Sequence, residues 1–171
     1  MIYTLITLTA AALLVAIDQG IKAWAASALA PVGNMPLLPG VIELRFHLNT
    51  GAAFSMLEGK QTFLILFTGA ALLAVAWYLL FRRPKKRVEY IGWLLVLAGG
   101  LGNLIDRVLH GQVVDYFNFL FMNFAVFNFA DVLITTGIGL LLLSLLLELL
   151  AERKNARAAA DSAPEADDGA V

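Results

Sequence analysis

Two aspartates of this chain have unusually apolar neighbours. Asp115 lies in the segment VVDYF, and Asp131 ends the segment FNFAD. A charged carboxylate is costly to place among apolar groups, so a purpose is expected for both. Two carboxyl groups brought close together share one proton, because both cannot easily ionise. The ionised member can then take a proton from water while the protonated member hydrogen-bonds a scissile carbonyl, which is aspartic-protease chemistry. The two residues therefore predict a catalytic pair that needs no metal or cofactor.

Other hydrolytic chemistries find little support. The chain has no cysteine and two histidines, His47 and His110, and it has no H-E-x-x-H motif. No cofactor and no metal site are therefore expected. A serine nucleophile is equally unsupported, because no G-x-S-x-G occurs and Ser55 has no obvious base beside it. The glycine-rich run GGLGN at 99–103 lacks the lysine of a phosphate-binding loop and is expected to serve close helix packing.

The composition is that of a membrane protein. Of the 171 residues, 60% are hydrophobic and 15% are charged, and the mean hydropathy is +0.81. Soluble domains have about 45–50% apolar and about 25% charged residues. Membrane lipids are therefore expected partners. Nucleic acid is not expected, because the net charge is −1.

Four apolar stretches approach the roughly 20 residues that a bilayer crossing needs. They are residues 2–29, 61–81, 88–107 and 131–150. The first has no basic segment before it and no clear cleavage signal after it, so we interpret it as a retained span. Helices are the only element of this kind that satisfies its backbone in lipid. The fold class is therefore an all-α membrane protein with one domain over 1–150, followed by a polar, alanine-rich tail, 151–171, expected to be disordered.

The basic residues predict the orientation. RRPKKR at 82–87, together with Arg153, Lys154 and Arg157 in the tail, contains eight of the 12 basic residues. The positive-inside rule therefore places both termini in the cytoplasm and two loops, residues of about 30–60 and 108–130, on the outer side. In the first outer segment, VIELRFHLN alternates apolar and polar residues, as a strand does. We expect a small surface β-hairpin over 41–57 that turns near Gly51.

The polar residues of the spans fall at one depth. A helix rises about 1.5 Å per residue, which brings five residues close to the outer edge of the hydrocarbon: Asp18, Asn103, Arg107, Asp115 and Asp131. Such residues usually face a bundle interior or a wet cavity. Each also has a simpler interpretation. Asp131 suits a helix N-cap, Asp18 suits an i, i+4 pair with Lys22, and Asp106 and Arg107 suit snorkelling to the headgroups.

Four sequence boxes occur in order along the chain: DQGIK, NTGAAF, GNLIDRVLHGQVVDYF and FNFADVLI. At these boxes the chain resembles lipoprotein signal peptidase, or signal peptidase II, a family of bacterial aspartyl membrane peptidases. The resemblance covers nearly everything except the 151–171 tail. One departure is Tyr116, where the family more often has Phe.

The resemblance implies four membrane helices, and with the expected outer hairpin the fold has a small extracytoplasmic β-hairpin or sheet element as well. It also implies an endopeptidase of the bacterial inner membrane that acts on diacylglyceryl-modified prolipoproteins, cleaving before the lipidated cysteine, with its site toward the periplasm. Globomycin-type cyclic peptides are implied inhibitors. The catalytic pair maps onto Asp115 and Asp131. Positions that support the pair or hold substrate map onto Asp18, Lys22, Asn49, Gly51, Asn103, Arg107, Asn128 and Ala130.

Two other classes of function remain open from the residues alone. A small transporter also gathers carboxylates within the membrane, but residues 61–81 carry no charge and the polar residues lie in one leaflet only. A scaffold that works through the outer hairpin is the other class. Asparagine at either aspartate discriminates these classes, because a scaffold tolerates such near-isosteric changes.

Overall fold

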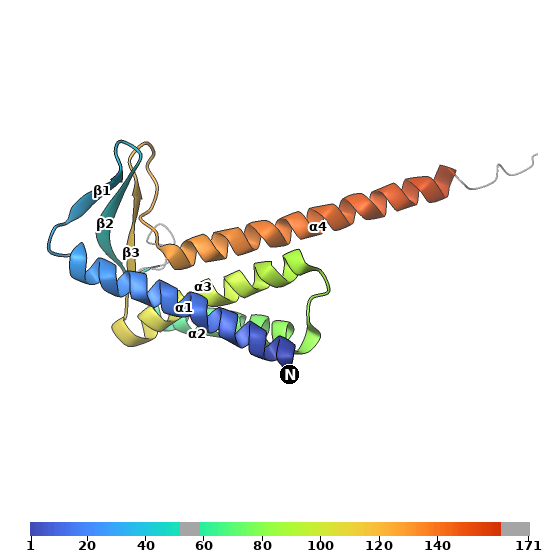
Figure 1. Cartoon of the computed structure of the whole chain (residues 1–171), viewed down its shortest axis with the longest axis horizontal. Helices are drawn as coiled ribbons and strands as arrows, with labels where there is room; N and C mark the ends of the chain where they lie inside the picture. Colours follow the sequence, from blue (N-terminus) through green and yellow to red (C-terminus); the bar gives the residue numbers. More distant parts are fainter. Residues whose placement is uncertain (52–58, 162–171) are drawn as a thin grey trace, which may run out of the picture.

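A computed structural model describes residues 1–51 and 59–161, with side chains described as far as Arg157. Within these residues, four helices are long and apolar enough to cross a membrane. They are α1 (Ile2–Ala28), α2 (Gln61–Trp77) with its π-helical continuation η2 (Tyr78–Arg82), α3 (Arg87–His110) and α4 (Phe129–Asp161). The helices run side by side and a small sheet lies at one end (Figure 1). The predicted class, four membrane helices with a small sheet, is confirmed.

Glycines let α3 approach its neighbours closely. A Cβ at Gly99 would collide with the backbone oxygen of Ala130 on α4, and one at Gly137 of α4 would collide with the oxygen of Gly92. Small residues allow helix backbones to come close where lipid provides no hydrophobic drive for association. The glycine-rich run therefore serves helix packing, as its sequence suggests, and it fixes α4 against α3.

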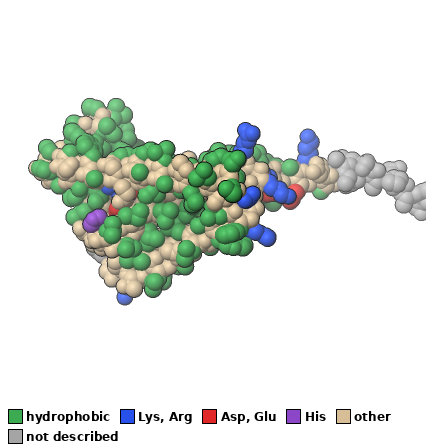
Figure 2. All heavy atoms as spheres, turned by 60° about the horizontal axis from the view of Figure 1, so that its bottom comes forward, with side chains coloured by type: hydrophobic (Ala, Val, Ile, Leu, Met, Phe, Trp, Pro, Cys, Tyr) green, Lys and Arg blue, Asp and Glu red, His purple; other side chains and the backbone are tan. Residues whose placement is uncertain are grey.

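The outer faces of the helices are apolar. On α4, Leu142 is 62% exposed and Leu145 is 53% exposed, and hydrophobic side chains are spread over the whole bundle surface seen in Figure 2. Leucines favour the centre of a bilayer. These faces suit lipid, whereas the charged residues of the spans are drawn inward.

The sheet differs from the expected hairpin. Its three antiparallel strands, in the order β1-β2-β3, are β1 (Asn34–Leu38), β2 (Ile42–Asn49) and β3 (Val113–Phe119). The alternating segment forms β2 as predicted, but its hairpin partner is β1, which precedes it, and not a segment after Gly51. Residues 52–58 of the expected hairpin lie outside the described residues. β3 comes from a segment that was expected to be a loop. Its β-branched and aromatic residues suit a strand, which explains the difference.

α4 is longer than the span predicted for it. Helix continues to Asp161 and projects beyond the other helices (Figure 1), whereas disorder was expected from residue 151. The correction has a local cause: residues 151–160 are mostly Ala, Glu, Arg and Lys, which are strong helix formers. Residues 162–171 lie outside the described part of the chain.

Candidate active site

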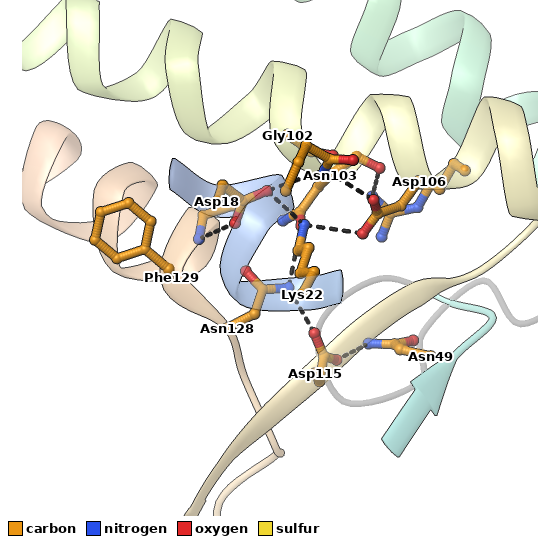
Figure 3. Close-up of polar contacts among 12 residues, drawn as sticks. Asp18, Lys22, Asn49, Gly102, Asn103, Asp106, Asp115, Asn128 and Phe129 are labelled. Carbon is orange, nitrogen blue, oxygen red and sulfur yellow. Dashed lines mark hydrogen bonds and ion pairs between the residues drawn. The ribbon is translucent and has the colours of Figure 1, made fainter. Parts of the chain in front are cut away.

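Asp115 projects from β3 and is only 2% exposed. The strand is placed by β2, where His47 is the residue opposite Asp115. Two side-chain amides donate to the carboxyl group: Asn49 Nδ2 at 3.0 Å from Oδ2 and Asn128 Nδ2 at 2.6 Å from Oδ1 (Figure 3). A segment expected to be a loop is therefore the strand that holds one member of the proposed pair.

Asp131 lies in the first turn of α4, next to its cap. Asn128 is the N-cap residue, because its Oδ1 accepts a hydrogen bond from the Asp131 backbone nitrogen at 3.0 Å. In return, Asp131 Oδ2 accepts from the Asn128 backbone nitrogen at 3.0 Å. This reciprocal arrangement is a capping box. The N-cap role considered for Asp131 is therefore wrong, and its second oxygen is free to accept from Asn103 Nδ2 at 2.8 Å.

Other elements anchor the start of α4. The backbone nitrogen of Ala130 donates to Asp18 Oδ1 of α1 at 3.1 Å, and that of Phe129 donates to the Tyr116 hydroxyl of β3 at 3.0 Å. The first amides of a helix have no partner within the helix. Here α1 and β3 supply those partners, so they also fix where Asp131 sits relative to Asp115.

A buried ion cluster lies between α1 and α3 (Figure 3). Lys22 Nζ is 2.9 Å from Asp18 Oδ2, 2.9 Å from Asp106 Oδ2 and 2.9 Å from Asn103 Oδ1. These contacts use all three donors of the ammonium group. The i, i+4 pair of Asp18 and Lys22 is present, but it is part of this larger cluster. Asp106 is only 3% exposed, so it does not snorkel.

The ion cluster sets the orientation of an amide that contacts Asp131. Lys22 has donors only, so the atom of Asn103 that faces it must be the carbonyl oxygen. The amino group of Asn103 then has to point toward Asp131. Asn128 Nδ2 also donates to Asn103 Oδ1, at 3.1 Å. The network therefore runs from the buried ions to both aspartates through two asparagines.

Gly102 makes room for the cluster. A Cβ at Gly102 would collide with Asp18 Oδ2. Gln19 completes the cluster, because its Nε2 donates to Asp106 Oδ1 at 2.9 Å and to the backbone oxygen of Gly102 at 3.2 Å. No motif or spacing in the sequence predicts a role for Gln19 or for the hydroxyl of Tyr116. Only the known departure from the family at Tyr116 pointed to either residue, and nothing local reveals what Gln19 contacts.

Arg107 is half-buried at the C-terminal end of α3, where it reaches the end of β2. Its Nη2 donates to the backbone oxygen of Gly51 at 2.9 Å, while its Nη1 donates to the oxygen of Asn103 at 3.3 Å. Gly51 is held in turn by its backbone nitrogen, which donates to Asn49 Oδ1 at 2.9 Å. The buried Nε of Arg107 has no hydrogen-bond partner among the described residues. The guanidinium is thus fixed in place by its two terminal nitrogens, while its Nε–H group stays unpaired among the described residues.

Both aspartates line one cavity of about 490 Å³. Its polar lining also includes Asn49, Asn103 and Arg107, and its apolar lining includes Phe119, Phe124, Phe127 and Val132. The other predicted site residues do not line the cavity but contact residues at the site: Lys22 and Asn128 donate to Asn103, Gly51 accepts from Arg107, and Asp18 accepts from Ala130. Within the described residues, no group of three or more His, Asp or Glu side chains is placed to hold a metal ion.

The electrostatics of Asp115 favour its protonated form. Burial raises the pKa of Asp115 from the ordinary 3.8 to about 7. Hydrogen bonds from Asn49 and Asn128 oppose this rise in pKa, while the charge of Asp131 adds to it. Near neutral pH, Asp115 therefore holds a proton for much of the time, while Asp131 lies at the helix end that favours a negative charge.

Two tyrosines offer a matched test of the anchoring of α4. In Tyr116→Phe, the buried amide of Phe129 loses its acceptor, and we expect the free energy of unfolding to fall by about 1–3 kcal/mol. Tyr3→Phe is the control, because the Tyr3 hydroxyl has no hydrogen-bond partner among the described residues. Its removal should change stability by less than about 0.5 kcal/mol. Thermal unfolding in detergent compares the two, and equal stabilities would contradict the anchoring role.

Comparison with known proteins places the chain. A family model described as signal peptidase (SPase) II matches residues 10–147. The lipoprotein signal peptidase of Lactiplantibacillus plantarum is 43% identical over 133 residues, covering 78% of this chain and 89% of the relative. That of Streptococcus pneumoniae is 38% identical over 137 residues, covering 80% and 89%.

Two solved structures share the fold. A bacterial membrane enzyme structure obtained by the in meso method at 2.3 Å resolution superposes with a TM-score of 0.75 at 31% identity, covering 84% of this chain and 88% of that one. A second, at 1.9 Å resolution, gives 0.73 at 32% identity, covering 82% and 92%. With the family model spanning all four helices and the relatives aligned over most of their length, the chain belongs to the signal peptidase II family of membrane peptidases.

Proposed function

We propose that this peptidase is an aspartyl endopeptidase that removes the signal peptide from diacylglyceryl-modified prolipoproteins. One observation carries the proposal: Asp115 and Asp131, from a strand and a helix, line the same cavity, and Asn128 contacts both of them. The family and the names of the relatives supply the substrate class. The oriented asparagines explain how both carboxyl groups are kept in position.

The two aspartates receive different roles. Asp131, at the positive end of α4, is the ionised member and takes a proton from the attacking water. Asp115, buried in β3, is the protonated member and donates its proton toward the carbonyl oxygen of the scissile bond. In the resulting diol, the proton held by Asp131 passes to the leaving nitrogen, and Asp115 recovers a proton from a diol hydroxyl. The C–N bond breaks, one water is consumed, and both carboxyl groups return to their starting states.

The cavity suits such a substrate. Its aromatic and aliphatic lining provides an apolar surface beside the carboxyl groups, where the acyl chains and the apolar signal segment have to lie. Arg107 lines the cavity, and its guanidinium group is a donor for the backbone carbonyls of a bound peptide. A globomycin-type cyclic peptide would occupy the same cavity and act as a competitive inhibitor. The resemblance to the family implies that the cleaved bond lies just before the lipidated cysteine, and we include this position in the proposal.

Cleavage of matched precursors tests the proposal. The enzyme is reconstituted in lipid nanodiscs and given a precursor peptide with or without the diacylglyceryl group on its cysteine. Mass spectrometry should locate the cut before the cysteine, in the lipidated precursor only, and a metal chelator should leave the rate unchanged. Equal cleavage of both precursors would show that the enzyme does not recognise the diacylglyceryl group. Cleavage at another bond would refute the proposed cleavage position.

The pH dependence follows from Asp115. Its protonated form is present below its pKa of about 7, so the rate should fall as pH rises through that value. The rate should fall again in acid, because the proposed reaction needs a base as well as an acid. Asn49→Leu removes a hydrogen bond that lowers the pKa of Asp115, so the alkaline fall should move to higher pH. A kcat/KM profile of both proteins checks this, and an unchanged alkaline limb would contradict the role of Asp115.

The same proposal includes an orientation in a bacterial inner membrane. The basic segment 82–87 and the basic end of α4 lie at the end of the bundle opposite the sheet (Figures 1 and 2), which supports cytoplasmic termini and a periplasmic site. The chain has no cysteine. Leu120→Cys, at an exposed position, should therefore react with an impermeant thiol reagent on spheroplasts, and Lys85→Cys should not.

A further inference from the structure

A second groove lies at the end of the bundle far from the aspartates. It has a volume of about 810 Å³ and runs between the turn η2, the residues that follow it, the first turns of α3 and the middle of α4. Basic side chains gather at this end of the molecule in Figure 2. Nothing in the proposed peptidase mechanism uses this groove.

The loop beside the groove is held in a particular shape. α2 ends in the π-helical turn η2, and Arg83 follows with a φ of +56°, which residues other than glycine rarely adopt. The Arg83 guanidinium lies 5.3 Å from the centre of the Tyr3 ring of α1, within cation–π distance. An unusual backbone that is tied down in this way often marks a functional segment.

The groove carries excess positive charge. Four cationic side chains, Arg82, Arg83, Lys85 and Lys86, and two carboxylates line it. Both carboxylates have partners: Glu148 is 3.1 Å from Lys86 Nζ, and Glu89 accepts from the Tyr78 hydroxyl. Among the described residues, Arg82 and Lys85 form no ion pair. Two cations therefore remain available at the mouth of the groove.

The wall below these cations is apolar. Trp93 of α3 and Ile138, Leu142 and Leu145 of α4 form it, and the three α4 side chains are about half exposed. A phospholipid has the matching arrangement, because its phosphate would lie beside the cations and its acyl chain against the apolar wall. A zwitterionic lipid would bring its own cation toward Arg82 and Lys85, whereas an anionic lipid would not. We propose that this groove is a binding site for an anionic phospholipid of the leaflet that faces residues 82–87.

Fluorescence quenching of Trp93 tests the proposal. Trp24→Phe and Trp77→Phe, both at exposed positions, leave Trp93 as the only tryptophan. The protein is placed in nanodiscs that contain a small fraction of lipid with brominated acyl chains. In one sample this lipid is phosphatidylglycerol, and in the other it is phosphatidylcholine. We expect brominated phosphatidylglycerol to quench Trp93 at a markedly lower mole fraction than brominated phosphatidylcholine. Each of the two available cations should contribute a factor of roughly five to this preference.

Charge variants locate the site. Arg82→Gln with Lys85→Gln should abolish most of the preference for phosphatidylglycerol. Arg153→Gln with Lys154→Gln removes the same charge from exposed residues of α4 that do not line the groove, and it should leave the preference intact. Equal quenching by both lipids, or an equal loss in both variants, would overturn a specific site. So would quenching that depends on protein density and not on headgroup, because a second copy of the chain would then fill the groove. Peptidase activity plays no part in these readouts.

Discussion

Asp115→Asn and Asp131→Asn are each expected to lower the rate of signal-peptide removal by roughly 10²–10⁴-fold, the usual contribution of a positioned acid or base. Asparagine keeps the size of the side chain and an acceptor oxygen. It loses the proton that Asp115 donates, or the basic oxygen of Asp131. The double variant should be little worse than either single variant, because residues that act as a unit give non-additive losses.

Single-turnover cleavage of a lipidated precursor measures these rates. Each variant should still insert in the membrane and accumulate, and the amide oxygen introduced by Asp131→Asn can still accept a hydrogen bond in the capping box. Glu148→Gln is the matched control, since Glu148 forms an exposed ion pair at the far end of the bundle, and its rate should be unchanged. Full activity in either aspartate variant would exclude the aspartyl mechanism and leave a different peptidase chemistry to be found.

Lys22→Met is expected to lower the free energy of unfolding by about 3–5 kcal/mol, because it leaves two buried carboxylates without their counter-charge. Lys22 is 3% exposed, Asp106 is 3% exposed and Asp18 is fully buried. The loss should extend to activity as well. Without Lys22, Asn103 Oδ1 keeps only the hydrogen bond from Asn128 Nδ2, so the amide that donates to Asp131 is held less firmly.

Two further variants separate charge from packing. Adding Asp18→Asn and Asp106→Asn to Lys22→Met removes the unpaired charges and should recover most of the lost stability. Lys86→Met is the surface control: its side chain is 47% exposed in the pair with Glu148, so its loss should cost less than about 1 kcal/mol. Thermal unfolding in detergent gives all three values. A Lys22→Met protein as stable as Lys86→Met would show that the buried cluster does not hold the helices together.

Local features of the sequence were sufficient for the membrane helices and for much of the site. Apolar length and basic flanks located four spans, and the alternation in residues 42–49 located β2. The rise of a helix placed Asp18, Asn103, Arg107 and Asp131 at one depth. The sequence boxes, by resemblance, gathered the same residues around Asp115. These features depend on neighbouring residues or on fixed helix geometry, so they can be predicted from a single sequence.

Tertiary structure decided which atoms of those residues meet. β3 was expected to be a loop, because a strand that pairs with a segment more than 60 residues earlier has no local signal beyond its own composition. Asn128, not Asp131, caps α4, and Tyr116 and Asp18 supply the remaining acceptors at its start. Lys22 contacts Asp106 as well as its helical neighbour Asp18. Each of these contacts joins elements far apart in the chain, so it depends on how the helices and strands pack and is invisible to local periodicity.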